Sequence, residues 1–181
     1  MTKRNRALDF GSGVGRTALA LKRDGGFKHV TGVDQSLWHI QTARKEIKRL
    51  GHEKQIKFVL SGVDMLLALR GSLFDFVFSI IALQHMIPPL MVAYIEQLCD
   101  SLYPGGHGFF QIPTKLLADY SQFKCEFSWS MSEGGMQVWY LERNQVVSVL
   151  GRRSCRVLED FDFDMIGIPQ AESRGFFFVK L

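Results

Sequence analysis

Apolar residues along the chain fall into two alternating patterns, which predict strands and helices in turn. Short runs of largely apolar residues are typical of buried strands, whereas apolar positions spaced three and four apart are typical of helices. The strands are predicted at 6–10, 29–33, 56–60, 74–81, 108–113, 156–163 and 175–180. The helices are predicted at 15–24, 37–50, 64–69 and 142–150, with another that Pro88 opens and Pro104-Gly105-Gly106 ends. Regular alternation of this kind predicts an α/β fold with a mostly parallel sheet.

The last two predicted strands are joined by residues 164–173, which show no helical period. Parallel neighbours need a crossover of about a dozen or more residues, usually helical, so these two strands are predicted to be antiparallel. The expected fold is therefore a Rossmann-like, doubly wound, mostly parallel seven-stranded sheet with an antiparallel C-terminal strand. Residues 1–181 are expected to form a single domain.

A glycine-rich turn between the first strand and the first helix is the main chemical signal in the sequence. It reads Asp9-Phe10-Gly11-Ser12-Gly13-Val14-Gly15, followed by Arg16. Glycine lets the backbone approach a ligand closely, and the following helix offers free N–H groups. The dinucleotide fingerprint G-x-G-x-x-G is absent. Asp9 would repel a pyrophosphate but suits a cationic ligand, so a cofactor other than a dinucleotide is predicted.

A second acid follows the second predicted strand. Asp34 lies about twenty residues after the glycine turn, where dinucleotide-binding folds place the acid that binds ribose hydroxyls. A carboxylate can accept both hydrogen bonds of a vicinal diol. The alternative role, capping the next helix, is one that Ser36 can fill. Asp34 and the adjacent Gln35 are therefore predicted to contact a cofactor.

The strand-Asp-x-Gly-x-Gly-x-Gly sequence resembles the first motif of class I S-adenosylmethionine-dependent methyltransferases. The resemblance rests on sequence motifs across residues 7–113, and across 142–181 only on the pattern of predicted helix and strands. It implies S-adenosyl-L-methionine as the cofactor, a ligand with a sulfonium and an α-amino group but no phosphate. The residues that it assigns to the turn are Asp9, Gly11, Ser12, Gly13 and Gly15.

Two further segments extend the resemblance. Asp64 and Met65 resemble the family's adenine-binding position, although Asp64 could instead cap a helix. The segment 79–85 resembles the end of the family's fourth strand, where Ser79 would face the cofactor and His85 the substrate. His85 is the candidate general base for an acceptor that must lose a proton, because imidazole titrates near neutral pH; a structural histidine is the alternative. No metal is implied.

The sequence departs from this family in two respects. Members usually carry helices before the first strand that cover the cofactor, whereas six residues precede position 7 here. Three explanations stay open: the lid helices are absent, the sequence is a fragment that lacks them, or the aromatic segment 114–140 replaces them. The Asn/Asp-Pro-Pro-Tyr/Phe motif used by adenine, cytosine and glutamine methyltransferases is also absent, which argues against nucleic-acid and protein-glutamine acceptors. The aromatic segment could instead stack a planar small molecule.

Charge and cysteine content change this picture little. The net charge is +4, and basic residues gather at 44–49 and 152–156, where a solvated face is favoured over a nucleic-acid surface. The three cysteines show neither disulfide nor metal spacing, and no apolar run is long enough to cross a membrane. A cytoplasmic protein is therefore expected, with no membrane partner.

The sequence thus predicts an enzyme that transfers methyl groups from S-adenosylmethionine to a small-molecule acceptor. An RNA or protein methyltransferase and a catalytically silent cofactor-binding module are the alternatives. A nicotinamide-dependent oxidoreductase is disfavoured by Asp9 and by the glycine spacing. A cleft without lid helices also suggests a homodimer formed across it.

Overall fold

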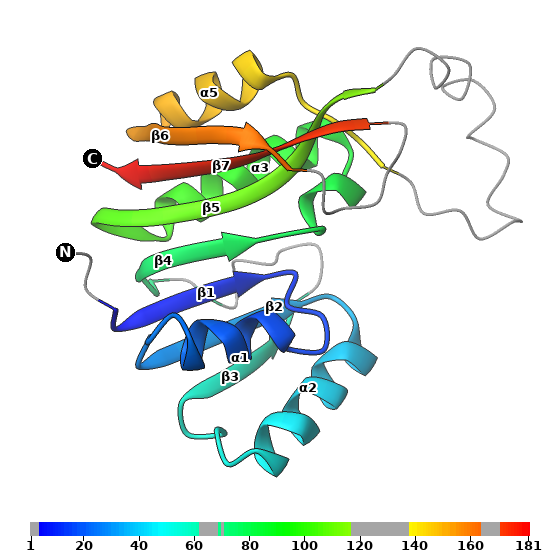
Figure 1. The fold of residues 1–181 in the computed structure, drawn as a ribbon, viewed down its shortest axis with the longest axis vertical. Coiled ribbons are helices and arrows are strands. Elements are labelled where there is room, and N and C mark those ends of the chain that lie inside the picture. The colour runs from blue at the N-terminus through cyan, green and yellow to red at the C-terminus, as the bar shows by residue number, and fades with distance from the viewer. Residues whose placement is uncertain (1–3, 62–68, 70, 117–137, 164–170) are drawn as a thin grey trace, which may run out of the picture.

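The computed structural model describes residues 4–61, 69, 71–116, 138–163 and 171–181 (Figure 1). Its strands are β1 Arg6–Phe10, β2 His29–Asp34, β3 Ile56–Leu60, β4 Phe74–Ser79, β5 Leu102–Leu116, β6 Cys155–Asp162 and β7 Ala171–Lys180. Its helices are α1 Arg16–Arg23, α2 Leu37–Arg49, the short 3₁₀ helix Leu83–His85, α3 Pro88–Asp100 and α5 Arg143–Arg152. The predicted strand–helix alternation is confirmed.

The strands form one seven-stranded sheet in the order β3-β2-β1-β4-β5-β7-β6. Strands β1 to β5 are parallel where they pair, and β7 runs antiparallel to both β5 and β6. This arrangement confirms the predicted fold class. The chain moves outward from β1 in one direction to β3 and then returns to β4 on the other side of β1. The switch point of the sheet therefore lies between β1 and β4, where ligands bind in doubly wound folds.

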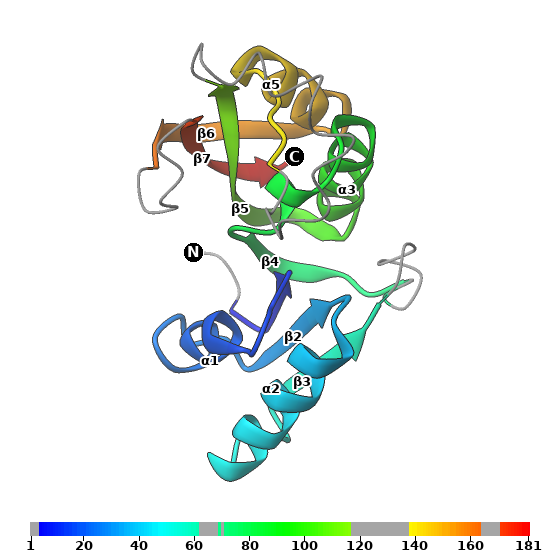
Figure 2. The same ribbon diagram turned by 90° about the vertical axis from the view of Figure 1, so that its right-hand side faces the viewer.

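Helices cover both faces of the sheet (Figure 2). On one face α1 and α2 pack through a cluster that includes Ala18, Ile40 and Phe58. On the other face α3 and α5 pack through a larger cluster that includes Ile95 and Val149. Helix α3 begins at Pro88 as predicted, with prolines in its first two positions, where no intrahelical N–H bond is lost. No helix among the described residues is long and apolar enough to cross a membrane.

Strand β5 is longer than predicted, because it runs from Leu102 to Leu116 and not over 108–113. The turn Pro104-Gly105-Gly106 was expected to end the preceding helix, but α3 ends at Asp100 and the turn lies inside β5. Phe74 pairs with Leu102 and Phe76 with His107, so the turn bulges out of the strand without ending the pairing. Gly105 has φ +77°, which a glycine adopts without strain. A bulge and a helix stop use the same residue types, so the pattern alone could not separate them.

Two other strands differ from prediction at their ends. Strand β4 stops at Ser79, two residues earlier than expected, because Ile81 has φ +56° and leaves the extended conformation. Strand β7 begins at Ala171, four residues earlier than expected, because it continues to pair with the end of β5. Apart from Leu69, the predicted short helix at 64–69 lies outside the described residues, as does most of the aromatic segment 114–140.

Candidate functional site

The glycine turn after β1 is held against the end of β2 by main-chain hydrogen bonds. The Gly11 and Ser12 N–H groups both donate to the Val33 carbonyl, at 2.9 and 3.0 Å. The Gly13 N–H donates to Asp34 Oδ2 at 2.8 Å. The turn glycines Gly11, Gly13 and Gly15 have φ of +75°, +52° and +86°. Such angles are costly for any other residue, so the glycine pattern is a requirement of this conformation.

Two of the turn glycines also make room for a neighbour. A Cβ atom added to Gly11 would lie 2.3 Å from the Cβ of Ala82, which follows β4. A Cβ atom on Gly15 would lie 2.6 Å from the ring of Phe58 on β3. By contrast, a Cβ atom on Gly13 would meet nothing within 4 Å. Gly11 and Gly15 therefore serve packing as well as conformation, whereas Gly13 leaves open space above the turn.

Asp34 is buried at the end of β2 and organises the turn. Its Oδ2 accepts from Gly13 N, while its Oδ1 accepts from Ser36 N at 2.8 Å and contacts His39 Nδ1 at 3.2 Å. A carboxylate offers about four acceptor positions, so capacity remains for a ligand hydroxyl. Ser36 caps α2 through its Oγ, which accepts from His39 N at 3.3 Å, as predicted. The predicted neighbour Gln35 is exposed beside Asp34.

Asp9 is the most perturbed carboxyl group at this end of the sheet. It is 2% exposed, and its Oδ2 atom has no hydrogen-bond partner among the described residues. Burial raises the pKa of Asp9 to about 7, against a weaker lowering effect of the Ala18 backbone hydrogen bond. The negative charge of Asp34 raises it further. An unpaired acid of this kind is stabilised in its ionised form by a cationic ligand.

Other buried polar atoms around the turn also lack partners. Within the described residues, the Oγ atoms of Ser61 and Ser79, at the ends of β3 and β4, are buried and make no hydrogen bond. Native proteins rarely leave buried polar atoms unpaired, so these two atoms and Asp9 Oδ2 fit a polar, partly cationic ligand. Ser61 was missed by the sequence analysis, and its only signal was its position directly after a strand.

The other residues predicted to belong to the site do not all face the space above the turn. Ser12 Oγ is also buried and unpaired, but it lies over Gly32 of β2, so the side chain points into the sheet. His85 ends the 3₁₀ helix that follows β4 and is half-buried. Asp64 and Met65 lie outside the described residues. The structure therefore brings Asp9, the glycine turn, Asp34 and Ser79 together at the switch point.

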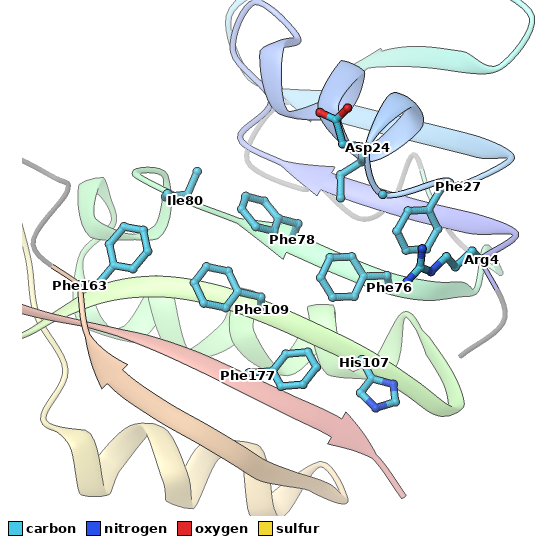
Figure 3. Close-up of a pocket in the computed structure, with 12 residues that line it drawn as sticks. Arg4, Asp24, Phe27, Phe76, Phe78, Ile80, His107, Phe109, Phe163 and Phe177 are labelled. Carbon is cyan, nitrogen blue, oxygen red and sulfur yellow. The ribbon is translucent and has the colours of Figure 1, made fainter. Parts of the chain in front are cut away.

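A separate hollow of about 600 Å³ lies on the α1 face of the sheet (Figure 3). Its floor is aromatic, with Phe76 and Phe78 from β4, Phe109 from β5 and Phe177 from β7. None of the residues predicted to bind the cofactor lines it. Its walls are mainly apolar, and His107 Nδ1 is the buried, unpaired polar atom among its described lining residues. The unpaired atoms of Asp9, Ser61 and Ser79 lie outside this hollow.

The basic clusters noted in the sequence are largely engaged within the molecule. Arg152 and Arg153 on α5 and its C-cap contact Glu96 on α3, at 3.2 and 3.1 Å. The hydrogen bonds from these arginines, chiefly from Arg153, hold the pKa of the Glu96 carboxyl below its usual value. On α2, Arg44 donates to the Phe58 carbonyl at 2.7 Å and Arg49 pairs with Glu46. These contacts agree with a solvated, ion-paired face.

Comparisons with solved structures show the same fold in other proteins. The structure superposes on a magnesium protoporphyrin IX methyltransferase from Synechocystis PCC 6803 with bound SAH, at 18% identity and a TM-score of 0.71, covering 97% of this chain and 74% of that one. An S-adenosylmethionine-dependent methyltransferase from Clostridium acetobutylicum ATCC 824 matches at 12% identity and a TM-score of 0.71, over 98% and 85% of the two chains. The [4+2]-cyclase SpnF matches at 15% identity and a TM-score of 0.73, over 99% and 76%.

A search of curated protein sequences finds no match. The profile of the methyltransferase domain family, in contrast, matches residues 7–106, which include β1 apart from Arg6, the glycine turn, β2 to β4 and α3. That match covers more than half of the chain and confirms both the predicted enzyme class and its cofactor, S-adenosylmethionine. This chain belongs to the methyltransferase domain family and has the class I, S-adenosylmethionine-dependent methyltransferase fold.

Proposed function

We propose that this chain transfers a methyl group from S-adenosylmethionine to a small-molecule acceptor, with the cofactor held at the glycine turn. The observation that carries the proposal is Asp9, a buried acid with an unpaired oxygen beside that turn. When bound, the cofactor supplies a methyl group on a cationic sulfur. A nucleophile on the acceptor would attack the methyl carbon in line with the carbon–sulfur bond, and the sulfur would leave as a neutral thioether. Asp9 would bind a cationic group of the cofactor, and Asp34 its ribose hydroxyls.

The other proposed cofactor contacts surround these two acids. The main chain of the turn would approach the cofactor closely at Gly13, because the space above Gly13 is open. Ser79 would donate its unpaired hydroxyl. The sequence further assigns Ser12, Gln35, Asp64 and Met65, of which Asp64 and Met65 would bind the adenine ring.

The choice of a small-molecule acceptor rests on two observations. The segment after β4 reads Ile87-Pro88-Pro89-Leu90 and lacks the Asn/Asp-Pro-Pro-Tyr/Phe motif of base and glutamine methylation. Arg152 and Arg153, at the end of α5, are paired with Glu96 and Asp100 of α3 and so do not present an open phosphate-binding surface. A nucleic-acid acceptor is accordingly the less favoured alternative. Salt-sensitive binding of RNA to this chain would reverse that order.

His85 is the proposed general base. Its replacement should lower the rate of methyl transfer without weakening cofactor binding. His85→Asn is expected to leave the affinity for cofactor within about threefold of wild type and to lower kcat by about 10²-fold or more, the usual contribution of a general base. Transfer of the radiolabelled methyl group to a screened acceptor would measure it. An unchanged kcat would give His85 a structural role.

The cofactor site itself is tested by calorimetric titration with S-adenosylmethionine, S-adenosylhomocysteine and NADH. We expect the first two ligands to bind with micromolar affinity and NADH not to bind. Asp34→Ala should abolish that binding, because it removes the acceptor of the Gly13 N–H together with the proposed ribose contact. Asp24→Ala is the matched control, since Asp24 is an exposed carboxylate after α1 and outside the turn.

Other outcomes of this titration would point to other functions. Cofactor binding without methyl transfer to any acceptor would favour a silent cofactor-binding module or a different reaction, and the similar fold of a [4+2]-cyclase makes the second a specific candidate. Binding of NADH alone would refute the proposal.

Two further expectations belong to this proposal. A homodimer across the cofactor cleft is predicted, and a monomeric mass by light scattering at working concentration would contradict it. A cytoplasmic location is predicted from the cysteine pattern, and imaging of the tagged protein tests it.

A further inference from the structure

The backbone turns sharply where β4 ends, at a residue that is poorly suited to the turn. Ile81 has φ +56°, and it is one of two described residues other than glycine with a positive φ. The left-handed region is costly for L-residues and most of all for β-branched ones, so a conformation of this kind persists only when its surroundings impose it. The side chain of Ile81 is 46% exposed, so burial of that side chain does not account for the strain.

The surroundings that impose it are polar and come from β5. Gln111 is fully buried, and its Oε1 atom accepts a hydrogen bond from Ile81 N at 3.0 Å. Its Nε2 atom donates to Gln84 Oε1 at 3.2 Å and to Ser173 Oγ at 2.6 Å. Ser173 Oγ in turn donates to the Ile112 carbonyl at 2.9 Å. Gln111 is thus fixed on the β7 side and presents its carbonyl oxygen to the turn after β4.

The segment held in this way reaches the glycine turn and the proposed base. Ala82 follows Ile81 directly and fills the space that a Cβ atom on Gly11 would need. The 3₁₀ helix that follows ends at His85, and its Gln84 carbonyl accepts from Trp139 N at 2.7 Å. A change of φ at Ile81 would therefore move Ala82 relative to Gly11, and His85 with it.

We propose that Gln111 is a positioning residue: by holding Ile81 in the left-handed conformation, it sets Ala82 against the glycine turn in the geometry that binds cofactor. Gln111 lies on β5 and acts through the main chain of residues 81–85 without touching the cofactor. This inference rests on the proposed function, because the geometry that it protects is that of the proposed cofactor site. Neither the glycine motif nor the fold predicts it, since the bond joins residues thirty positions apart.

The test compares Gln111→Leu, Ile81→Gly and the double variant by titration with S-adenosylhomocysteine. Leucine has a similar size to glutamine but cannot accept a hydrogen bond from Ile81 N, so Ile81 is expected to leave the left-handed conformation. The affinity for S-adenosylhomocysteine should then fall by about tenfold or more, which corresponds to the free energy of typical left-handed strain. Glycine adopts φ +56° without strain, so Ile81→Gly alone should bind within about threefold of wild type. The double variant should then recover most of the affinity lost in Gln111→Leu.

A matched control separates positioning from stability. Ser173→Ala removes one of the two acceptors of Gln111 Nε2, while it keeps the bond to Gln84 Oε1 and the bond from Ile81 N. It should lower the midpoint of thermal unfolding, as Gln111→Leu does, yet bind cofactor within about threefold of wild type because a lost hydrogen bond on the β7 side does not free Ile81. If Ser173→Ala weakens binding as much as Gln111→Leu, or if glycine at position 81 gives no recovery, the inference is overturned.

Hydrogen exchange on the ligand-free chain keeps this test independent of cofactor binding. The Ile81 amide should be protected in wild type and in Ser173→Ala, and should exchange at least about tenfold faster in Gln111→Leu, because its acceptor is gone. Equal exchange in wild type and Gln111→Leu would overturn the inference. A wild-type chain that shows this protection but does not bind S-adenosylhomocysteine would refute the proposed function instead.

Discussion

Asp9→Asn is expected to stabilise the fold and to abolish cofactor binding. The carboxyl of Asp9 is buried with one oxygen unpaired, and its pKa is raised from 3.8 to about 7. Ionisation in the folded state therefore costs about 4 kcal/mol at pH 8, at roughly 1.4 kcal/mol per pKa unit. The amide avoids that cost but buries an N–H group without an acceptor, so a net gain of about 2 kcal/mol is expected.

The pH dependence of this stabilisation has a defined sign. Because the pKa of Asp9 is higher in the folded state, the folded chain binds the proton more tightly than the unfolded chain does. The stability contributed by protonated Asp9 is complete below pH 3.8 and is lost as the pH rises through about 7. Urea unfolding should therefore show the gain from Asp9→Asn in full at pH 8 and progressively less toward pH 4.

Cofactor affinity should rise with pH, whereas the stability that protonated Asp9 contributes falls with pH. Only the ionised carboxylate attracts a cationic group, so the affinity of wild type for S-adenosylhomocysteine should fall about tenfold from pH 8 to pH 6, as a group with a pKa near 7 takes up its proton. Asp9→Asn should bind too weakly to measure at either pH.

Asp75→Asn is the matched control for Asp9→Asn. Asp75 is also a buried acid, on the neighbouring strand β4, but its Oδ2 atom accepts from the Asn5 and Arg6 N–H groups at 3.1 and 2.8 Å. Its replacement should lower stability and leave cofactor affinity unchanged. A destabilised Asp9→Asn variant that still binds cofactor would contradict the role given to Asp9.

Gly11→Ala is expected to destabilise the ligand-free fold by about 3 kcal/mol, the sum of a left-handed backbone conformation and an overpacked contact. The added Cβ atom would lie 2.3 Å from the Cβ of Ala82, so the turn or the segment after β4 must move. Cofactor binding should be lost with it, because both segments border the site. Chemical denaturation and calorimetry measure the two effects.

Gly13→Ala tests the effect of a positive φ without the close contact that Gly11 makes with Ala82. Gly13 also has a positive φ, +52°, but an added Cβ atom would meet nothing within 4 Å. Its replacement should therefore cost only about 1–2 kcal/mol, the conformational part. If the two variants were equally unstable, the contact between the glycine turn and Ala82 would not be tight.

The sequence alone determined the sheet, the glycine turn and the class of enzyme. These features depend on local order: the period of apolar residues defines strands and helices, and a turn with successive positive φ angles requires glycines. Strands β1 to β3 and helix α2 accordingly match their predicted boundaries within one residue. Asp34 was also identified locally, since the end of a strand places it beside the turn.

Only the tertiary structure decided how the site is held and charged. The burial of Asp9, the contact of Gly11 with Ala82 and the bond from Ile81 to Gln111 join segments that are far apart in sequence. Likewise, Pro104-Gly105-Gly106 is a bulge because β4 continues to pair beyond it, not because of its own composition. Burial, strain and hydrogen bonding arise from neighbours that the fold supplies, and local sequence does not specify those neighbours.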